Sequence, residues 1–255
     1  ENIFLDAGGN IHLATPPGDI IDHAPSSFYT SGKTPVASSF IIKNNTVRFS
    51  LGKYDPGRSV TIDPWTVTPS LPSDNKAFEV KTDCQGNIYI YGGRNPYKLQ
   101  KYTSAGTPVW TFSTAFNQWF GDMVVDSAGN SYLTEGYPSD IAKVSTTSAP
   151  VFTNYNNANN YEFWCLVYNY DTKQLFLGGT DWTNGYGAGL SNVDVNTGNL
   201  SNQTIISSAG GFSNTEVRAM VQAPNGTLYC LSFDSLIATN AAFGVLFSTS
   251  SSYNF

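Results

Sequence analysis

The chain has 255 residues, enough for one large all-β domain or for a small domain followed by a larger one. Only 13% of the residues are charged, whereas 14% are aromatic and 23 are glycine, a composition that favours short strands and tight turns over amphipathic helices. The net charge is −6 and the basic residues form no cluster, which argues against nucleic acid as a partner. No apolar run approaches the roughly 20 residues that cross a bilayer, so we expect no membrane insertion.

Residues 1–70 predict the C-terminal part of a β-sandwich-like domain. Short alternating runs such as 10–15, 39–43 and 46–55 are separated by turns rich in Gly, Pro and Asn, as in antiparallel sheets. The first residues carry no basic region and no apolar signal core, so we expect the sequence to begin inside a structural element. His12 and His23 belong to no nucleophile motif, and we expect them to be packed or solvent-facing.

One turn phrase recurs four times in the rest of the chain, each time just before an aromatic-rich apolar run. It begins at Asp83 (DCQGNIY), at Asp126 (DSAGNSY), in degraded form at Tyr170 (YDTKQLF) and at Ala223 (APNGTLY). The Asp can accept backbone N–H groups and the Gly supplies a positive φ, so the phrase predicts a hairpin turn. Carboxylates are too few for a calcium cage, and we expect no metal. Residues 6–10 read similarly but lie far before the first copy, so we interpret them as an ordinary hairpin.

A spacing of roughly 40–50 residues between copies is typical of propeller blades. Each phrase follows an innermost strand and leads into a second strand. Two further strands about a second turn come next, which gives the four strands of a β-propeller blade. We predict blades at about 74–115, 116–159, 160–208 and 209–255, within a propeller domain of residues 71–255. A ring of four is conceivable, but we expect a partial propeller. The innermost strands place Val80, Val124, Leu166 and Ala219 near its centre.

The order of motifs resembles a family of large secreted proteins of Bacteroidota. Residues 20–29 (IIDHAPSSFY), 47–55 (VRFSLGKYD) and 60–64 (VTIDP) are similar to the end of an uncharacterised β-domain of that family. In those proteins an Ile-Asp-Pro signature leads into propeller repeats of the SBBP kind, marked by Asp-x-x-Gly-Asn-x-Tyr. The third repeat of this chain departs from that pattern at 170–176. The resemblance implies export by the type IX route, a secreted or cell-surface location and no catalytic residue.

Acidic residues near the starts of the innermost strands could meet across the central channel. Two of them, held apart with different pKa values, would suit a glycoside hydrolase or polysaccharide lyase, although solvated acids are the simpler interpretation. The four candidates are Glu79, Asp122, Glu162 and Glu216. Residues 102–110 are similar to the tryptophan-docking turn of quinoprotein blades, but the other repeats do not sustain the likeness, and we expect no cofactor. We expect the three cysteines to be small packed residues: Cys84, Cys165 and Cys230. A disulfide bridge between Cys165 and Cys230 remains an alternative.

Aromatic residues form the more informative group of candidates. Residues 180–189 predict an exposed loop inserted in the third blade, where ring faces could stack on sugars while carboxylate and amide groups bind hydroxyls. Packing between blades is the alternative. The predicted contact residues are Asp181, Trp182, Asn184 and Tyr186, and the wider aromatic group adds Trp119, Tyr137 and Trp164.

Together these patterns predict a non-enzymatic scaffold or adhesion segment of a larger extracellular protein. Its expected partners are other protein modules, cell-surface components or carbohydrate. A glycan-binding or glycan-processing propeller that uses central carboxylates and loop aromatics is the alternative.

Overall fold

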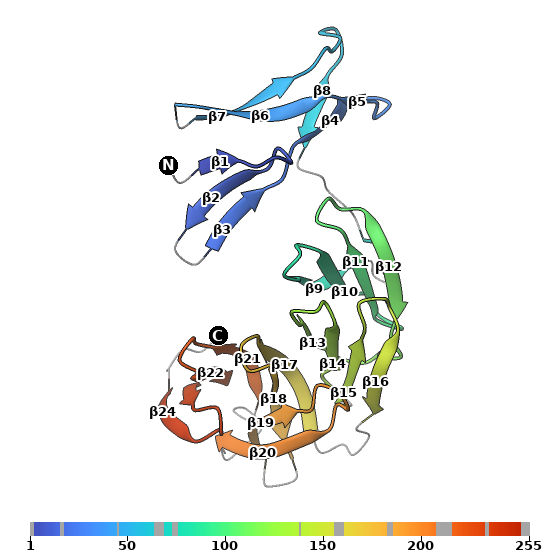
Figure 1. Ribbon diagram of the computed structural model, residues 1–255. Coiled ribbons are helices and arrows are strands. Elements are labelled where there is room, and N and C mark those ends of the chain that lie inside the picture. Colours follow the sequence, from blue (N-terminus) through green and yellow to red (C-terminus); the bar gives the residue numbers. More distant parts are fainter. Residues whose placement is uncertain are drawn as a thin grey trace. The chain divides into compact units, whose positions relative to one another are not determined.

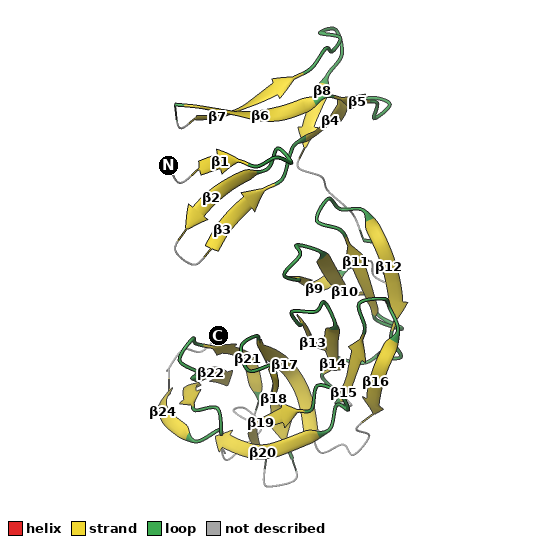
Figure 2. Ribbon diagram, in the orientation of Figure 1, coloured by secondary structure: helices red, strands yellow, loops and turns green. Residues whose placement is uncertain are grey.

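The computed structural model describes residues 3–15, 18–44, 46–63, 69–72, 76–137, 139–155, 161–182, 186–207, 216–232 and 235–250 (Figure 1). All of its regular elements are β-strands, as Figure 2 shows, and the described part contains no helix that could cross a membrane. The chain divides into two compact units, Glu1–Thr68 and Pro69–Phe255. The predicted all-β class is confirmed.

The first unit contains three small antiparallel sheets. One sheet has the order β1-β2-β3, the second β5-β4-β8, and the third pairs β6 with β7. Ile11, Val36 and Phe40 are its buried apolar side chains among the described residues. The strands are β1 (Ile3–Leu5), β2 (Ile11–Thr15), β3 (Gly18–Asp22), β4 (Ser26–Tyr29), β5 (Pro35–Val36), β6 (Ser38–Lys43), β7 (Thr46–Leu51) and β8 (Val60–Asp63).

The second unit contains four sheets of four strands each, and in every sheet the strands pair antiparallel in chain order. The first blade comprises β9 (Ala77–Thr82), β10 (Ile88–Gly92), β11 (Lys98–Tyr102) and β12 (Pro108–Ser113). The second comprises β13 (Phe120–Val125), β14 (Ser131–Glu135), β15 (Asp140–Val144) and β16 (Pro150–Tyr155). The third comprises β17 (Tyr161–Asn169), β18 (Gln174–Asp181), β19 (Gly187–Val193) and β20 (Leu200–Ser207). The fourth comprises β21 (Val217–Gln222), β22 (Leu228–Ser232), β23 (Ser235–Thr239) and β24 (Val245–Ser250).

The four blades follow one another along an arc, with β9, β13, β17 and β21 innermost (Figure 1). Neighbouring innermost strands contact one another, and β17 and β21 also pack on the second strand of the preceding blade. This is the arrangement of propeller blades, and the predicted four-stranded repeats are confirmed. The positions predicted near the centre lie on these innermost strands.

The core lies between the blades rather than within them. Each blade has a forward face, defined here as the face that carries the aromatic residue at the end of its turn phrase. Tyr89, Tyr132 and Phe176 are buried there under the next blade, inside three successive apolar clusters. Tyr229 is the counterpart in the fourth blade, and it remains partly exposed. A single blade therefore does not bury its own apolar face, as expected of repeat architectures.

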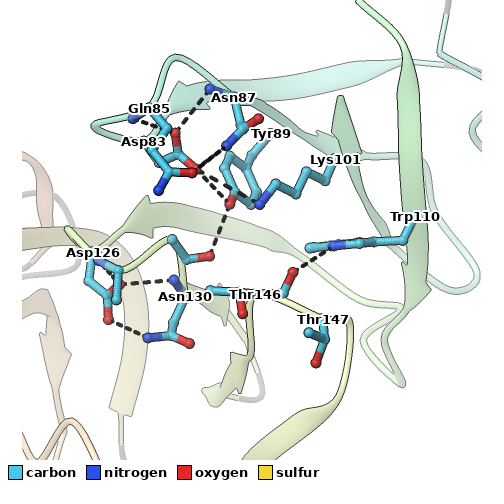
Figure 3. A network of polar contacts seen from close by, with 12 residues as sticks. Asp83, Gln85, Asn87, Tyr89, Lys101, Trp110, Asp126, Asn130, Thr146 and Thr147 are labelled. Atoms are coloured by element: carbon cyan, nitrogen blue, oxygen red, sulfur yellow. Dashed lines mark hydrogen bonds and ion pairs between the residues drawn. The ribbon is translucent and has the colours of Figure 1, made fainter. Parts of the chain in front are cut away.

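The turn phrase also ties neighbouring blades together (Figure 3). Asp83 Oδ1 accepts the backbone N–H groups of Gln85 and Asn87 at 2.9 Å, and Oδ2 accepts the Asn87 side-chain amide at 2.9 Å. The Tyr89 hydroxyl lies 3.0 Å both from Asp83 Oδ2 and from the carbonyl oxygen of Gly129, in the turn of the second blade. The Trp110 indole, from the first blade, donates to the Thr146 carbonyl of the second blade at 2.9 Å. A local turn thus becomes an inter-blade contact.

The first unit contains a turn of the same design at Asp6. Its Oδ1 accepts the N–H groups of Gly8 and Asn10 at 2.8 and 2.9 Å, and its Oδ2 accepts the Asn10 amide at 2.7 Å. His12 Nε2 lies 3.3 Å from Asp6 Oδ2. In the second blade the Tyr132 hydroxyl occupies the equivalent place, 3.3 Å from Asp126 Oδ2. Residues 6–10 thus form the predicted hairpin between β1 and β2, and its turn has the same hydrogen bonds as the turns of the blades. These hydrogen bonds are local, so distance along the chain from the first blade does not affect them.

Candidate functional site

A cavity of about 540 Å³ opens at the end of the blades where the innermost strands begin. Because the strands are antiparallel, the start of a first strand and the end of a second strand lie at the same end of a blade. Trp119 precedes β13, Tyr137 follows β14 and Trp182 follows β18. The lining consists of Trp119, Phe120, Tyr137, Glu162, Trp164, Trp182 and Arg218, from the second, third and fourth blades.

Backbone contacts hold the two segments of the second blade beside the third. The Gly136 N–H donates to the Trp119 carbonyl at 2.7 Å, and the Phe163 N–H donates to the Gly136 carbonyl at 2.9 Å. A Cβ atom at Gly136 would lie 2.0 Å from Cζ3 of Trp164, so only glycine admits that ring. The segments that carry the aromatic side chains are therefore fixed by hydrogen bonds and close packing.

The Trp164 ring is held by charged groups. Its Nε1 donates to Glu162 Oε2 at 2.9 Å, and the Arg218 guanidinium carbon lies 4.2 Å from the ring centroid. Arg218 forms an ion pair with Glu216. The cation–π contact occupies one face of the ring, and the hydrogen bond to Glu162 fixes its edge.

The Trp182 and Trp119 rings offer free surface instead. Trp182 stacks on Tyr186 with ring centroids 4.9 Å apart and an interplanar angle of 24°. Tyr186 has a φ of +63°, an unusual value for an aromatic residue and one that often marks functional loops. Trp182 Nε1 is buried and has no hydrogen-bond partner within the described part of the chain. The Trp119 side chain is 62% exposed.

The four predicted acidic residues are only partly brought together. Glu162 and Glu216 lie in contact, and burial raises the pKa of Glu216; the Arg218 guanidinium opposes this shift, whereas the neighbouring Glu162 carboxyl adds to it. Burial likewise raises the pKa of Asp122 to about 6, against hydrogen bonds from the Leu166 and Met123 amides that lower it. Glu79 forms an ion pair with Lys81 at 2.8 Å.

The predicted contact loop differs from the structure. Residues 180–181 and 187–189 of the predicted loop are strand, because β18 and β19 continue to pair as far as Asp181 opposite Gly187. Asp181 is buried at the end of β18, so its expected exposure is wrong, and its role as a contact stays a prediction. Trp182 and Tyr186 lie in the short connection and are partly rather than fully exposed. Asn184 lies outside the described residues.

Within the wider aromatic group, Trp119, Tyr137, Trp164 and Trp182 line the same cavity, which the sequence did not predict. Sequence reasoning missed Arg218 and Phe120. Register offers a signal for the site, because the pairing with the second strand shifts directly after Phe120, Phe163 and Val217 in their blades. Trp119, Glu162 and Glu216 precede these residues and are therefore equivalent.

Metal and thiol chemistry find no support in the described residues. No three His, Cys, Asp or Glu side chains gather there in a way that could hold a metal ion. Cys84, Cys165 and Cys230 are free, and Cys165 and Cys230 are buried. The Cys165–Cys230 bridge that the sequence left open does not form. Burial raises the pKa of the Cys230 thiol to about 12, which suits a packed residue rather than a nucleophile.

Residues 1–65 match a family described as a domain of unknown function, DUF7948. No curated protein matches the chain. Among solved structures, virginiamycin B lyase from Staphylococcus aureus has a TM-score of 0.56 and 10% sequence identity, over 99% of this chain and 84% of the lyase. A protein from Lactobacillus plantarum has a TM-score of 0.51 and 13% identity, over 98% of this chain and 84% of that protein.

A protein of unknown function from Bacteroides caccae gives a TM-score of 0.49 with 9% identity, over 97% of this chain and 77% of that one. At identities this low, the likeness to the lyase and to the L. plantarum protein shows only a shared fold. The chain therefore has a β-propeller-like fold, and its first 65 residues match the DUF7948 model.

Proposed function

We propose that this chain is a non-enzymatic binding segment, used for adhesion or as a scaffold, of a larger secreted or cell-surface protein. The observation that carries this proposal is the aromatic cavity formed by three blades. Exposed and half-buried rings held on a rigid β scaffold suit contact with a partner, because rings give large contact area at low entropic cost.

The carboxylates beside the cavity argue for binding without turnover. Glu162 Oε2 accepts hydrogen bonds from Trp164 Nε1 and from Thr180 Oγ1, at 2.9 and 2.8 Å. Glu216 shares a hydrogen bond with Glu162 and an ion pair with Arg218. Glycosidases instead hold their two acids about 5–9.5 Å apart with the substrate between them. Two carboxyl groups in direct contact leave no room for a glycosidic bond.

The order of domains supports the proposed extracellular location. Residues 1–65, which match the DUF7948 model, precede the blades. The secreted Bacteroidota proteins that the sequence resembles likewise have an uncharacterised β-domain before their propeller repeats. We therefore propose that the blades are SBBP-type repeats and that the protein is exported by the type IX route. Detection of the chain on intact producing cells, and its loss when that route is disabled, would test this part.

A binding assay with parallel activity assays tests the proposed function. The immobilised chain is offered polysaccharides, mucin-type glycoproteins, matrix proteins and bacterial cells. We expect binding that the double substitution Trp119→Ala, Trp182→Ala abolishes and that Tyr54→Ala preserves, because Tyr54 is an exposed aromatic residue of the first unit. On glycoside, polysaccharide and ester substrates we expect no turnover. Turnover that disappears in Glu162→Gln would contradict the proposal and favour a glycan-processing enzyme.

A further inference from the structure

We propose that the aromatic cavity binds an uncharged glycan segment, of which one sugar ring stacks on Trp119 while a hydroxyl group at the edge of the Trp182 ring accepts a hydrogen bond from the Trp182 indole N–H. This inference rests on the proposed function and names the ligand class of that site. It draws on which ring faces are free, on an unpaired buried donor and on the charge balance of the lining.

Only some of the rings can receive a ligand. Arg218 covers one face of Trp164, whose Nε1 is bonded to Glu162. Tyr186 covers one face of Trp182, and the Trp182 side chain also lines the cavity. Trp119, 62% exposed, provides the stacking platform from the neighbouring blade. Two indole rings from different blades suit the flat, C–H-rich faces of sugar rings better than an extended peptide.

The Trp182 indole N–H supplies the directional contact. Buried tryptophan N–H groups usually have a partner, and a buried donor without one costs about 1–3 kcal/mol. Within the described residues Trp182 Nε1 has none, although its atom is shielded from solvent. A sugar hydroxyl group at the edge of this ring, in line with the N–H, would satisfy the donor. The unusual backbone of Tyr186 fixes the stack that presents it.

The charges of the lining select an uncharged ligand. Glu162, Glu216 and Arg218 lie together, and the guanidinium is already paired with Glu216 and stacked on Trp164. An anionic sugar would meet carboxylates and no free cation. A quaternary ammonium, which aromatic cages otherwise favour, would meet Arg218 in the same lining. The cavity, about 540 Å³, lies within the range of about 300–1,000 Å³ for small-ligand sites, so it suits a short glycan segment.

Titration calorimetry of the full chain tests the inference with defined probes. These are lactose, maltose, cellobiose and N,N′-diacetylchitobiose, with sialyllactose as the acidic match for lactose and choline as the cationic probe. We expect at least one neutral sugar to bind, with sialyllactose weaker than lactose if lactose is that sugar, and no binding of choline. Trp182→Phe keeps a ring face but removes the donor, and should weaken binding about 3- to 10-fold. Trp182→Ala should weaken it about 30-fold or more, whereas Tyr54→Ala should change nothing.

The outcomes separate this inference from the function on which it rests. If no neutral sugar binds, or if choline or sialyllactose binds more tightly, the ligand class is overturned. The proposed function still stands in that case if adhesion continues to depend on Trp119 and Trp182. Should Trp182→Phe bind as the wild type does, the indole donor has no part in recognition. If adhesion is absent as well, both proposals fail.

Discussion

The second and fourth blades carry the same kind of forward face, yet among the described residues only that of the second blade is covered by another blade. In the second blade, Val124, Tyr132, Lys143 and Phe152 lie in one row across β13–β16. In the fourth, Val221, Tyr229, Ala238 and Phe247 form the matching row across β21–β24.

Exposure differs sharply between the two rows. Val124 and Tyr132 are 9% and 1% exposed, because the third blade packs on them. Val221 and Phe247 are 60% and 46% exposed. The register and three of the four side chains are alike, so the burial of Val124 and Tyr132 comes from the neighbouring blade and not from the strands of their own blade.

The polar groups of the two blades differ in the same sense. Asp122 in the second blade accepts the Leu166 N–H of the third blade at 2.8 Å, and its counterpart in the fourth blade is Ala219. Asp126 closes the turn of the second blade, and its counterpart is Ala223. The second blade thus carries polar groups that serve its turn and its contact with the next blade, whereas alanine replaces both in the fourth.

The largest effect should come from removing the buried ring of the covered face. Tyr132→Ala deletes a side chain packed between two blades and should lower the free energy of unfolding by about 3–5 kcal/mol. Tyr229→Ala removes the equivalent, partly exposed ring and should cost about 1 kcal/mol. Urea unfolding of both variants measures the difference. Equal losses would mean that the fourth forward face is covered as well.

The buried carboxyl of Asp122 should make the covered interface sensitive to pH. Burial raises its pKa from about 3.8 to about 6, so between these pH values the folded chain binds more protons than the unfolded chain. The contribution of Asp122 to the free energy of unfolding therefore falls as pH rises from 4 to 6, by about 3 kcal/mol in total, and then levels off. We expect Asp122→Asn to gain stability relative to the wild type by about that amount between pH 4 and pH 7.

Asp194 provides the opposite control. Hydrogen bonds from the Asn196 and Thr197 amides lower its pKa, so it stabilises the fold above the pKa of the unfolded chain and loses that contribution as pH falls. Asp194→Asn should therefore lose stability relative to the wild type at neutral pH and not at acidic pH. If both substitutions show the same pH trend, the assignment of the effect to Asp122 is wrong.

Much of the fold could be predicted from the sequence because its signals are local. The hydrogen bonds of the Asp83 and Asp126 turns join residues no more than six apart, so the phrase gives both the turns and the repeat. The candidate site depends on contacts between blades. Trp119 and Trp182 share a cavity only because the blades stack. From the sequence alone, Arg218 is expected to be a solvated charge on its strand, and only the structure shows its contact with Trp164.

The turn of the second blade should contribute less than its buried ring. Asp126 accepts the Ala128 and Asn130 amides at 3.0 and 2.9 Å and the Asn130 side chain at 2.9 Å. Asp126→Ala leaves these donors unpaired and should lower the free energy of unfolding by about 2 kcal/mol. Asp171→Ala, at an exposed position of the third turn, is the matched control and should have little effect. Thermal unfolding compares the two variants, and similar melting temperatures would contradict the role of Asp126.

The smallest effect tests whether the fourth blade can be made more like the second. Its turn already has the same backbone hydrogen bonds, from Ala223 N–H to the Thr227 carbonyl and from Gly226 N–H to the Ala223 carbonyl, both at 2.9 Å. Ala223→Asp would add a carboxylate within reach of the Asn225 N–H and of the Thr227 N–H, which now donates to Asn225 Oδ1 at 3.1 Å, and should stabilise the fold by about 0.5–1 kcal/mol, or about 1–3 °C in Tm. Ala223→Glu adds the same charge on a longer side chain that does not fit the turn, and should leave Tm unchanged. Equal gains from both would show that charge, and not turn geometry, sets the stability of this blade.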